Sequence, residues 1–369
     1  MRSRTLQIGG FAHVDAVFLG GGLSPVIQTM WKDRLSFSDI ERESGEAVIA
    51  RIEGLKRIGC GLLRFAVPDL DAAEALGSLA SMVSMPLVAD IHFDYKIALR
   101  CLDFPIAKIR INPGNIGSRD KVEQVVNKAA ANSRPIRVGV NAGSLPVDIR
   151  QSVDSGSLGS AEALVLAAER EIAVFNELGF SDVLVSMKAS SVADTIRANR
   201  IFAERSDVPL HVGVTEAGPL IAGVVRNAAA LVALLGEGIG DTIRVSLSDT
   251  MENEVIAGRE ILETVRELKG AGEATRQWVR IVSCPRCGRS GFDTHAFAAR
   301  WLNRLYAMEK NITVAIMGCA VNGPEEARHA DIGITGAGDK VLIFAKGKVI
   351  RTIDAGEADT AFEEELRRL

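Results

Sequence analysis

Eight short apolar runs alternate with helical patterns over the first two thirds of this chain, and this alternation constrains the fold more than any other feature. Continuous apolar segments such as Val183–Ser186 are typical of parallel strands that are buried on both faces. Eight strand–helix units predict an α/β fold, a closed (β/α)₈ TIM barrel. The predicted strands are Val26–Met30, Leu62–Val67, Pro86–Ile91, Ala107–Asn112, Ile136–Asn141, Val183–Lys188, Leu210–Thr215 and Thr242–Ser246.

A doubly wound open sheet is the alternative fold for such a pattern. It usually carries a glycine fingerprint directly after its first strand. Here Gly20-Gly21-Gly22 precedes a strand, so the barrel is the preferred interpretation.

The helical patterns also indicate where the barrel ends. They include Glu41–Arg57, Lys121–Ala131, Ala161–Leu178, Ala193–Arg205, Leu220–Leu235 and, closing the eighth unit, Glu252–Lys269. The residues Gly270–Glu273 then have the composition of a linker. We therefore predict a barrel domain over residues 1–270 and a small α+β domain over residues 275–369. The elements predicted for the second domain are strand Val279–Val282, helix His295–Lys310, strand Thr313–Met317, hairpin Val341–Phe344 with Val349–Thr352, and helix Ala355–Arg368.

Charge and apolar patterning exclude several classes of function. The chain has 43 basic and 47 acidic residues, which gives no overall attraction to nucleic acid or membrane. Its most apolar stretch, Leu220–Gly236, is interrupted by Arg226 and Asn227 and is too short for a membrane helix. Five cysteines, an odd number, do not suggest a secreted disulfide framework. We expect a soluble cytoplasmic protein.

Polar and charged residues lie at or near the ends of many predicted strands. They are Arg64, Asp90, Arg110, Arg137, Asn141, Lys188, Glu216, Arg244 and Ser246. Taken singly, an arginine at a strand end is ordinarily a solvated side chain. In a barrel, however, these ends meet at one mouth, where active sites lie. Several cations at one mouth repel each other unless an anion binds, and arginine matches phosphate oxygens well, so we predict a diphosphate site.

Three of the cysteines are placed so that they could bind the same metal centre. Cys284 and Cys287 form a C-x-x-C motif at a strand end, and Cys319 follows the next strand. Thiolates at this spacing suit zinc or an iron–sulfur cluster, and the spacing does not separate the two. The other interpretations of these cysteines are a redox pair formed by Cys284 and Cys287, or three thiols that share no function. Cys60 and Cys101 lie in barrel segments and are interpreted as buried apolar residues, so the fourth ligand is left among Glu325, Glu326, His329 and His295.

Long segments of both domains match one known family. The chain resembles the 4-hydroxy-3-methylbut-2-enyl diphosphate synthases of the methylerythritol phosphate pathway, in their two-domain bacterial form. The matching segments are Val88–Tyr95, Arg110–Gly117, Arg137–Leu145, Ser186–Ser190, His211–Gly218, Gly238–Leu247, Ser283–Arg289 and Met317–Pro324.

The resemblance implies an iron–sulfur oxidoreductase of isoprenoid precursor biosynthesis. Its [4Fe–4S] cluster would be held by Cys284, Cys287, Cys319 and Glu326. With two electrons from flavodoxin or ferredoxin, it would convert 2-C-methyl-D-erythritol 2,4-cyclodiphosphate to 4-hydroxy-3-methylbut-2-enyl diphosphate and water. The family is homodimeric, with the cluster domain of one chain over the barrel mouth of its partner.

The resemblance also implies roles for the strand-end residues. Arg64, Arg110, Arg137, Lys188 and Ser246 would contact the diphosphate, with Asn141 and Arg244 close by. Glu216 is the first candidate to relay a proton to the departing oxygen. Asp90 could do the same or orient a neighbouring arginine, and either carboxylate could simply be an ion-pair partner. His92 and His211 are interpreted as structural.

Two departures from the family pattern leave other functions open. Glu325 stands where the family usually has glycine, and the segment Gln28–Asp33, which contains Trp31, differs from the family's loop after the first strand. One alternative function is a phosphate-binding barrel with a structural zinc domain and no redox activity. The other is an enzyme of the same architecture that acts on another substrate.

Overall fold

The computed structural model describes residues 2–41, 44–271, 278–320 and 323–369. The chain divides into two compact units, Met1–Gly270 and Ala271–Leu369. Residues 272 and 273 of the predicted linker lie outside the described residues.

Eight parallel strands form the first unit. Adjacent strands pair in the order β8-β7-β6-β5-β4-β3-β10-β9, and a parallel bridge between Val185 and Leu210 links the two ends of this series. The predicted TIM barrel is therefore confirmed. The strands are β3 (Val26–Met30), β4 (Leu62–Ala66), β5 (Leu87–Asp90), β6 (Lys108–Ile111), β7 (Ile136–Asn141), β8 (Val183–Lys188), β9 (His211–Val212) and β10 (Thr242–Ile243).

The last two barrel strands are shorter than the sequence predicts. Gly213 follows β9 and approaches the backbone of the segment after β10 closely. A β-carbon at Gly213 would lie 2.2 Å from the carbonyl oxygen of Arg244. Such a close approach requires glycine, and it marks the point where β9 and β10 end their regular pairing.

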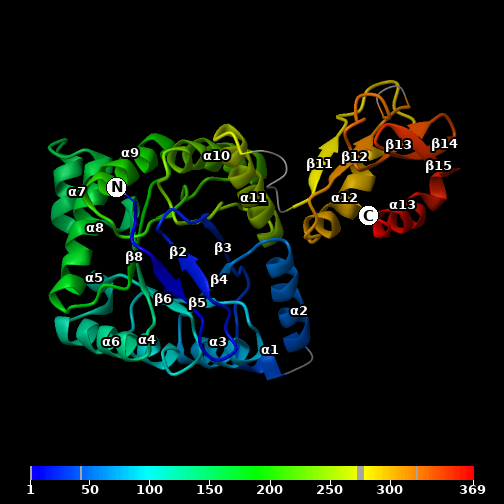
Figure 1. Ribbon diagram of the computed structural model, residues 1–369. Helices are drawn as coiled ribbons and strands as arrows, with labels where there is room; N and C mark the ends of the chain where they lie inside the picture. Colours follow the sequence, from blue (N-terminus) through cyan, green and yellow to red (C-terminus); the bar gives the residue numbers. More distant parts are fainter. Residues whose placement is uncertain (1, 42–43, 272–277, 321–322) are drawn as a thin grey trace. The chain divides into compact units, whose positions relative to one another are not determined.

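Helices surround the ring of strands (Figure 1). Those predicted from the sequence correspond to α2, α6 and α8 to α11, whereas the alanine-rich α3 and the short α4, α5 and α7 were not singled out. None of the helices in the described part of the chain is long and apolar enough to span a bilayer. The bounds are α1 (Phe37–Glu41), α2 (Ser44–Arg57), α3 (Leu70–Met82), α4 (Tyr95–Cys101), α5 (Pro113–Ile116), α6 (Arg119–Ala131), η1 (Ala142–Ser144), α7 (Val147–Asp154), α8 (Ser160–Glu177), α9 (Val192–Arg205), α10 (Leu220–Gly236) and α11 (Met251–Leu268).

An amino-terminal hairpin, which the sequence analysis did not predict, packs against the barrel. Its strands β1 (Leu6–Ile8) and β2 (Val17–Leu19) pair antiparallel. Their buried side chains join a cluster with Leu62, Val88 and Leu184, which lie in the first halves of barrel strands. The hairpin therefore covers the amino-terminal end of the barrel, and the opposite end carries the polar residues.

The second unit is a five-stranded mixed sheet with two main helices. Strands β11 (Arg280–Ser283), β12 (Thr313–Met317) and β13 (Ile332–Ala337) are parallel, and β14 (Lys340–Ala345) and β15 (Lys348–Asp354) continue antiparallel. The helices are α12 (Thr294–Tyr306) and α13 (Ala358–Arg367), the latter preceded by the turn η3 (Ala355–Glu357). Phe297, Trp301 and Phe362 bring the two helices together through ring contacts of 5.0–5.7 Å.

Strand β13 was missed in the sequence because Gly333 and Gly336 weaken its strand pattern. The structure explains the first of these glycines. A β-carbon at Gly333 would lie 2.2 Å from the ring of Phe344 on β14. The predicted helix ending at Lys310 stops instead at Tyr306.

Candidate functional site

The pairing of the barrel strands places the predicted polar residues side by side. Asp90 is opposite Arg110, Arg110 is opposite Arg137, and Asn141 is opposite Lys188. The residues Arg137, Arg110 and Lys188 are buried, at 2%, 5% and 7% exposure. Burying a charged group without compensation is costly, so each of these cations needs a partner.

Asp90 is the partner of two arginines. Its carboxylate lies 2.9 Å from Arg64 Nη2, 3.2 Å from Arg110 Nη1 and 3.5 Å from His92 Nε2. Burial by itself raises the pKa of Asp90, but the charge of Arg64, the hydrogen bond from His92 and the charge of Arg110 outweigh it and hold the pKa well below the usual range. The carboxylate therefore stays ionised. Of its two predicted roles, this geometry favours orienting the arginines over proton relay.

Gly139, inside β7, makes room for Arg110. A β-carbon there would lie 2.6 Å from Arg110 Nε. Arg110 Nη2 donates to the Gly139 carbonyl at 3.1 Å, and the Gly139 N–H donates to Asn112 Oδ1 at 3.0 Å. A glycine within a strand pattern is a signal of close approach, and here it indicates where the guanidinium lies.

A buried histidine joins the site from β9, a role that the sequence analysis did not assign. His211 Nε2 lies 3.1 Å from Lys188 Nζ, and its Nδ1 lies 2.8 Å from Thr242 Oγ1. Burial, followed by the charge of Lys188, lowers the pKa of His211 well below its ordinary value. The ring is therefore neutral, so that Nε2 can accept from Lys188 and Nδ1–H can donate to Thr242.

Lys108 is a second residue that the sequence analysis missed. It precedes Arg110 by two positions on β6 and therefore faces the same way. Its side chain is fully buried and donates to Gln28 Oε1 at 3.3 Å. Burial, then the charges of Arg137 and Arg64, lower the pKa of Lys108 well below its usual value. A lysine that alternates with Arg110 on a strand whose other residues are isoleucines was the available signal.

The described part of the mouth contains more positive than negative charge. Its basic side chains are Arg64, Lys108, Arg110, Arg137, Lys188 and Arg244, and its buried carboxylates are Asp90 and Glu254. Arg137 Nε and Nη1 and Arg64 Nε are buried and find no hydrogen-bond partner among the described residues. Unsatisfied guanidinium donors beside excess positive charge fit an anion that presents several oxygens, as a diphosphate does.

The remaining predicted residues lie at the end of a strand or in the loops that follow. Ser246 is partly buried after β10, and Asn141 ends β7. Glu216 is exposed in the loop after β9, with a φ of 52°. A left-handed backbone is uncommon for a residue other than glycine and is found often at functional sites.

The lowered pKa values predict the direction of proton movement. Burial, then the charges of Arg137 and Arg244, lower the pKa of Lys188 well below 10.5, so the unfolded chain holds more protons than the folded one between the two values. The free energy of unfolding of the ligand-free protein should therefore rise with pH in that window. A bound anion favours the charged lysine, so its binding should take up protons within the same pH window.

Calorimetry of pyrophosphate binding in buffers of different ionisation enthalpy measures this uptake. Lys188→Met should lower the uptake relative to the unchanged protein, since it removes the titrating group while leaving the protons of pyrophosphate itself unaltered. Equal uptake by the two proteins would contradict the assignment of the lowered pKa to Lys188.

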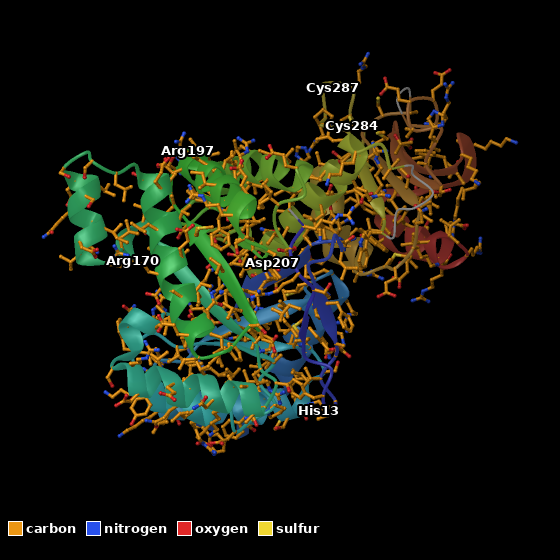
Figure 2. All side chains as sticks on the ribbon, turned by 60° about the vertical axis from the view of Figure 1, so that its left-hand side comes forward. His13, Arg170, Arg197, Asp207, Cys284 and Cys287 are labelled. Carbon is orange, nitrogen blue, oxygen red and sulfur yellow. The ribbon has the colours of Figure 1, made fainter. Side chains whose placement is uncertain are left out.

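The cysteines of the second unit are brought together by two parallel strands. Cys284 follows β11 and Cys319 follows β12, and the Cys284 N–H donates to the Ile316 carbonyl at 2.9 Å. Cys284 and Cys287 lie at the same end of the sheet (Figure 2). Arg286 between them has a left-handed φ of 67°, which lets the C-x-x-C segment turn tightly.

Three observations fit these residues to a metal group. A β-carbon at Gly318 would lie 3.7 Å from Cys284 Sγ and 2.7 Å from Ser290 Oγ, so glycine is needed where the two cysteine segments meet. Hydrogen bonds from the backbone and then the side chain of Arg289 lower the pKa of Cys287 and so favour the thiolate. Arg289 also interacts electrostatically with Cys319 and Glu326. Cys287, Cys319 and Glu326 thus surround one guanidinium, and Cys284 lies beside Gly318. Three thiols and a carboxylate are a donor set suited to iron or zinc.

The side chains are not arranged as a finished coordination shell. Within the described ranges, no group of three His, Cys, Asp or Glu side chains is placed to hold a metal ion. Val321 and Asn322, part of the matched segment after Cys319, lie outside these ranges. Of the four candidates for a further ligand, Glu326 is the one that shares Arg289 with the cysteines.

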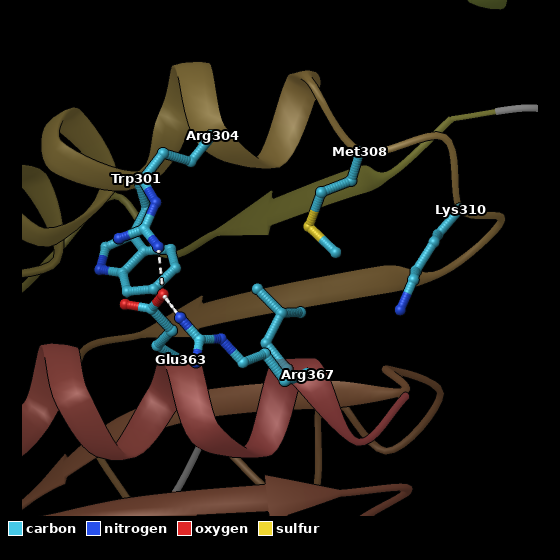
Figure 3. A pocket seen from close by; sticks show the side chains of 7 residues that line it. Trp301, Arg304, Met308, Lys310, Glu363 and Arg367 are labelled. Carbon is cyan, nitrogen blue, oxygen red and sulfur yellow. Dashed lines mark hydrogen bonds and ion pairs between the residues drawn. The ribbon is translucent and has the colours of Figure 1, made fainter.

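A separate pocket of about 310 Å³ lies between α12 and α13 (Figure 3). Trp301, Met308 and Leu366 contribute apolar surface, and three cations contribute charge. Glu363 pairs with Arg304 at 2.8 Å and with Arg367 at 2.6 Å, so both arginines already have a carboxylate partner. The pocket is thus less suited to an anion than the barrel mouth.

Together the two units define a class of protein: a TIM barrel with a cationic mouth, joined to a small domain with three cysteines near the ends of two parallel strands. Residues 11–259 match the family model described as the GcpE TIM-barrel domain, and residues 280–368 match that of the GcpE protein C-terminal domain. The chain belongs to this family, whose members include the 4-hydroxy-3-methylbut-2-en-1-yl diphosphate synthases, as the resemblance in the sequence indicated.

Individual relatives cover the whole chain. A 4-hydroxy-3-methylbut-2-en-1-yl diphosphate synthase (flavodoxin) of Treponema pallidum is 49% identical over 384 residues, which span 100% of this chain and 92% of that protein. The protein of the same name from Geobacter sulfurreducens is 40% identical over 369 residues, which span 100% and 99% of the two chains. The similarity therefore includes both the barrel and the cysteine domain.

Proposed function

We propose that this chain performs the reductive ring opening and dehydration of 2-C-methyl-D-erythritol 2,4-cyclodiphosphate. It is an enzyme, an iron–sulfur oxidoreductase of isoprenoid precursor biosynthesis that forms 4-hydroxy-3-methylbut-2-enyl diphosphate. Relatives of that name at 40–49% identity over the full chain support this function. The observation that carries it in the structure is the buried, unsatisfied Arg137 within an excess of positive charge.

The mouth residues bind and polarise the substrate. Arg64, Arg110, Arg137, Lys188 and Ser246 contact the diphosphate, and Asn141 and Arg244 lie beside it. As the ring carbon–oxygen bond breaks, negative charge develops on the leaving phosphate, and preorganised cations stabilise it. Asp90 keeps Arg64 and Arg110 oriented through its two ion pairs. Glu216, exposed after β9, relays a proton to the departing oxygen.

Cys284, Cys287, Cys319 and Glu326 hold a [4Fe–4S] cluster in this proposal. When bound, the cluster supplies the electrons and a Lewis-acidic iron. The shared neighbour Arg289 and the clearance at Gly318 support this set of ligands. Flavodoxin, which the names of the relatives include, is the proposed electron donor, with ferredoxin as the other candidate. A homodimer and a cytoplasmic location, which suits cysteines that are not joined in disulfides, complete the proposal.

The choice between Glu326 and Glu325 as the fourth ligand can be tested by substitution. Glu326→Gln should lower the iron content after anaerobic reconstitution, because an amide is a poorer iron ligand than a carboxylate. Glu325→Gln is the matched control at the adjacent exposed position and should retain about four irons per chain. The reverse pattern would move the ligand to Glu325.

An anaerobic assay tests the function as a whole. The reconstituted protein, given the cyclodiphosphate and a strong reductant, should form the linear diphosphate. A colourless protein that binds one zinc, binds the cyclodiphosphate and does not turn it over would instead be a phosphate-binding barrel with a structural zinc domain. Full cluster content without turnover of this compound would indicate another substrate.

A further inference from the structure

The loop after β3, where this chain departs from its family, is tied to the loop after β10 by Lys32. Its Nζ donates to the Leu247 carbonyl at 2.8 Å and to the carbonyl of Asp249. The same ammonium lies 3.0 Å from Glu254 Oε1. One side chain, 30% exposed, thus connects two loops that are more than 200 residues apart in sequence.

Glu254, in the first turn of α11, is the centre of these contacts. Its carboxylate is 1% exposed and accepts from Thr29 Oγ1 at 2.6 Å and from the Leu247 N–H at 3.0 Å. It also accepts from Arg244 Nε and Nη2, both at 3.3 Å. A buried carboxylate with this many donors remains ionised and fixes the groups around it.

These contacts determine the orientation of the Arg244 guanidinium and the position of the segment that contains Ser246. Glu254 holds the Nε–Nη2 edge of Arg244, while Nη1 lies 3.6 Å from Met30 Sδ, a weak acceptor that a phosphate oxygen can replace. Leu247, directly after Ser246, is held on both sides: its N–H by Glu254 and its carbonyl by Lys32. The position of Ser246 follows from that of its neighbour.

We propose that Lys32 and Glu254 are positioning residues that together orient Arg244 and Ser246 toward one phosphate of the substrate. This inference rests on the proposed function. It assigns to Lys32, within the divergent Gln28–Asp33 loop, and to Glu254 a part in substrate binding through other residues.

Steady-state kinetics of the anaerobic, cluster-loaded protein test the positioning role of Lys32 and Glu254. Glu254→Gln should raise KM for the cyclodiphosphate about tenfold, since it loosens charged hydrogen bonds to Arg244, with kcat changed less than about threefold. Lys32→Met, at a more exposed position, should raise KM by about threefold to fivefold. This variant tests the proposal independently if Glu254→Gln does not fold. Glu263→Gln is the control on the same helix, where Glu263 pairs with Arg266 at 2.7 Å away from these residues, and should leave KM unchanged.

A double-mutant cycle separates positioning from general stabilisation. If Glu254 acts through Arg244, Glu254→Gln in an Arg244→Met background should raise KM by less than about threefold further. An equal effect in both backgrounds, or an unchanged KM in Lys32→Met, would overturn the proposal. Iron content should be the same in all of these proteins. Absence of turnover by the unchanged protein would instead count against the proposed function itself, so the two failures are distinguishable.

Discussion

Cys319→Ala is expected to reduce the iron content from about four atoms per chain to less than about one and to remove turnover of the cyclodiphosphate. Cys319 is buried at the end of β12, beside the C-x-x-C segment after β11. Removing one thiolate of three leaves a donor set that cannot hold four irons, since metal binding depends on the deprotonated ligands. The substitution removes the sulfur and adds no larger group, so the sheet should stay folded.

The matched control is Cys101→Ala in the barrel. Cys101 is fully buried, and burial raises the pKa of its thiol to about 12, so it is protonated and unsuited to binding metal. This variant should keep the iron and the activity, with a modest loss of stability from the small cavity. Iron and sulfide analysis with circular dichroism gives the comparison. A Cys319→Ala protein with full iron content would remove Cys319 from the proposed ligands.

Arg137→Met should have opposite effects on substrate binding and on the stability of the ligand-free protein. Arg137 is 2% exposed, two of its nitrogens lack a partner among the described residues, and burial lowers its pKa together with the charges of Arg64 and Arg110. Methionine fills a similar volume without charge. The melting temperature should rise by about 2–4 °C for each kcal/mol that the uncompensated charge costs.

Binding of pyrophosphate or the cyclodiphosphate should weaken by about 1.5–3 kcal/mol, because charged hydrogen bonds to phosphate oxygens are lost. Arg197→Met is the control, since Arg197 is exposed on α9 and pairs with Glu162 of α8 at 2.5 Å. It should change neither property by much. Calorimetric titration and thermal unfolding measure the two effects. A destabilised Arg137→Met protein with unchanged affinity would show that Arg137 is a structural cation and not part of the anion site.

Several mouth residues could be found in the sequence because a strand end is a local feature. Arg64, Arg110, Arg137 and Lys188 stand out as cations in largely apolar runs. Closure of the barrel brings the ends of its strands together, so these positions can be grouped without knowing the individual contacts. Lys108 carries the same kind of local signal, since a lysine two residues before Arg110 faces the same side. The helix-borne Glu254 does not, because its contacts with Thr29 and Arg244 exist only after the barrel has closed.

The sequence by itself determined the α/β alternation, the eight barrel strands, the C-x-x-C motif with its third cysteine, and the family. Each of these depends on residue order over short stretches, where periodicity and spacing carry the information. Only the tertiary structure decided which charges neutralise each other. It paired Asp90 with Arg64 and Arg110, placed neutral His211 beside Lys188, and left Arg137 with unsatisfied donors. Burial and distances between groups far apart in the chain govern these pairings, and neither is a property of any local segment.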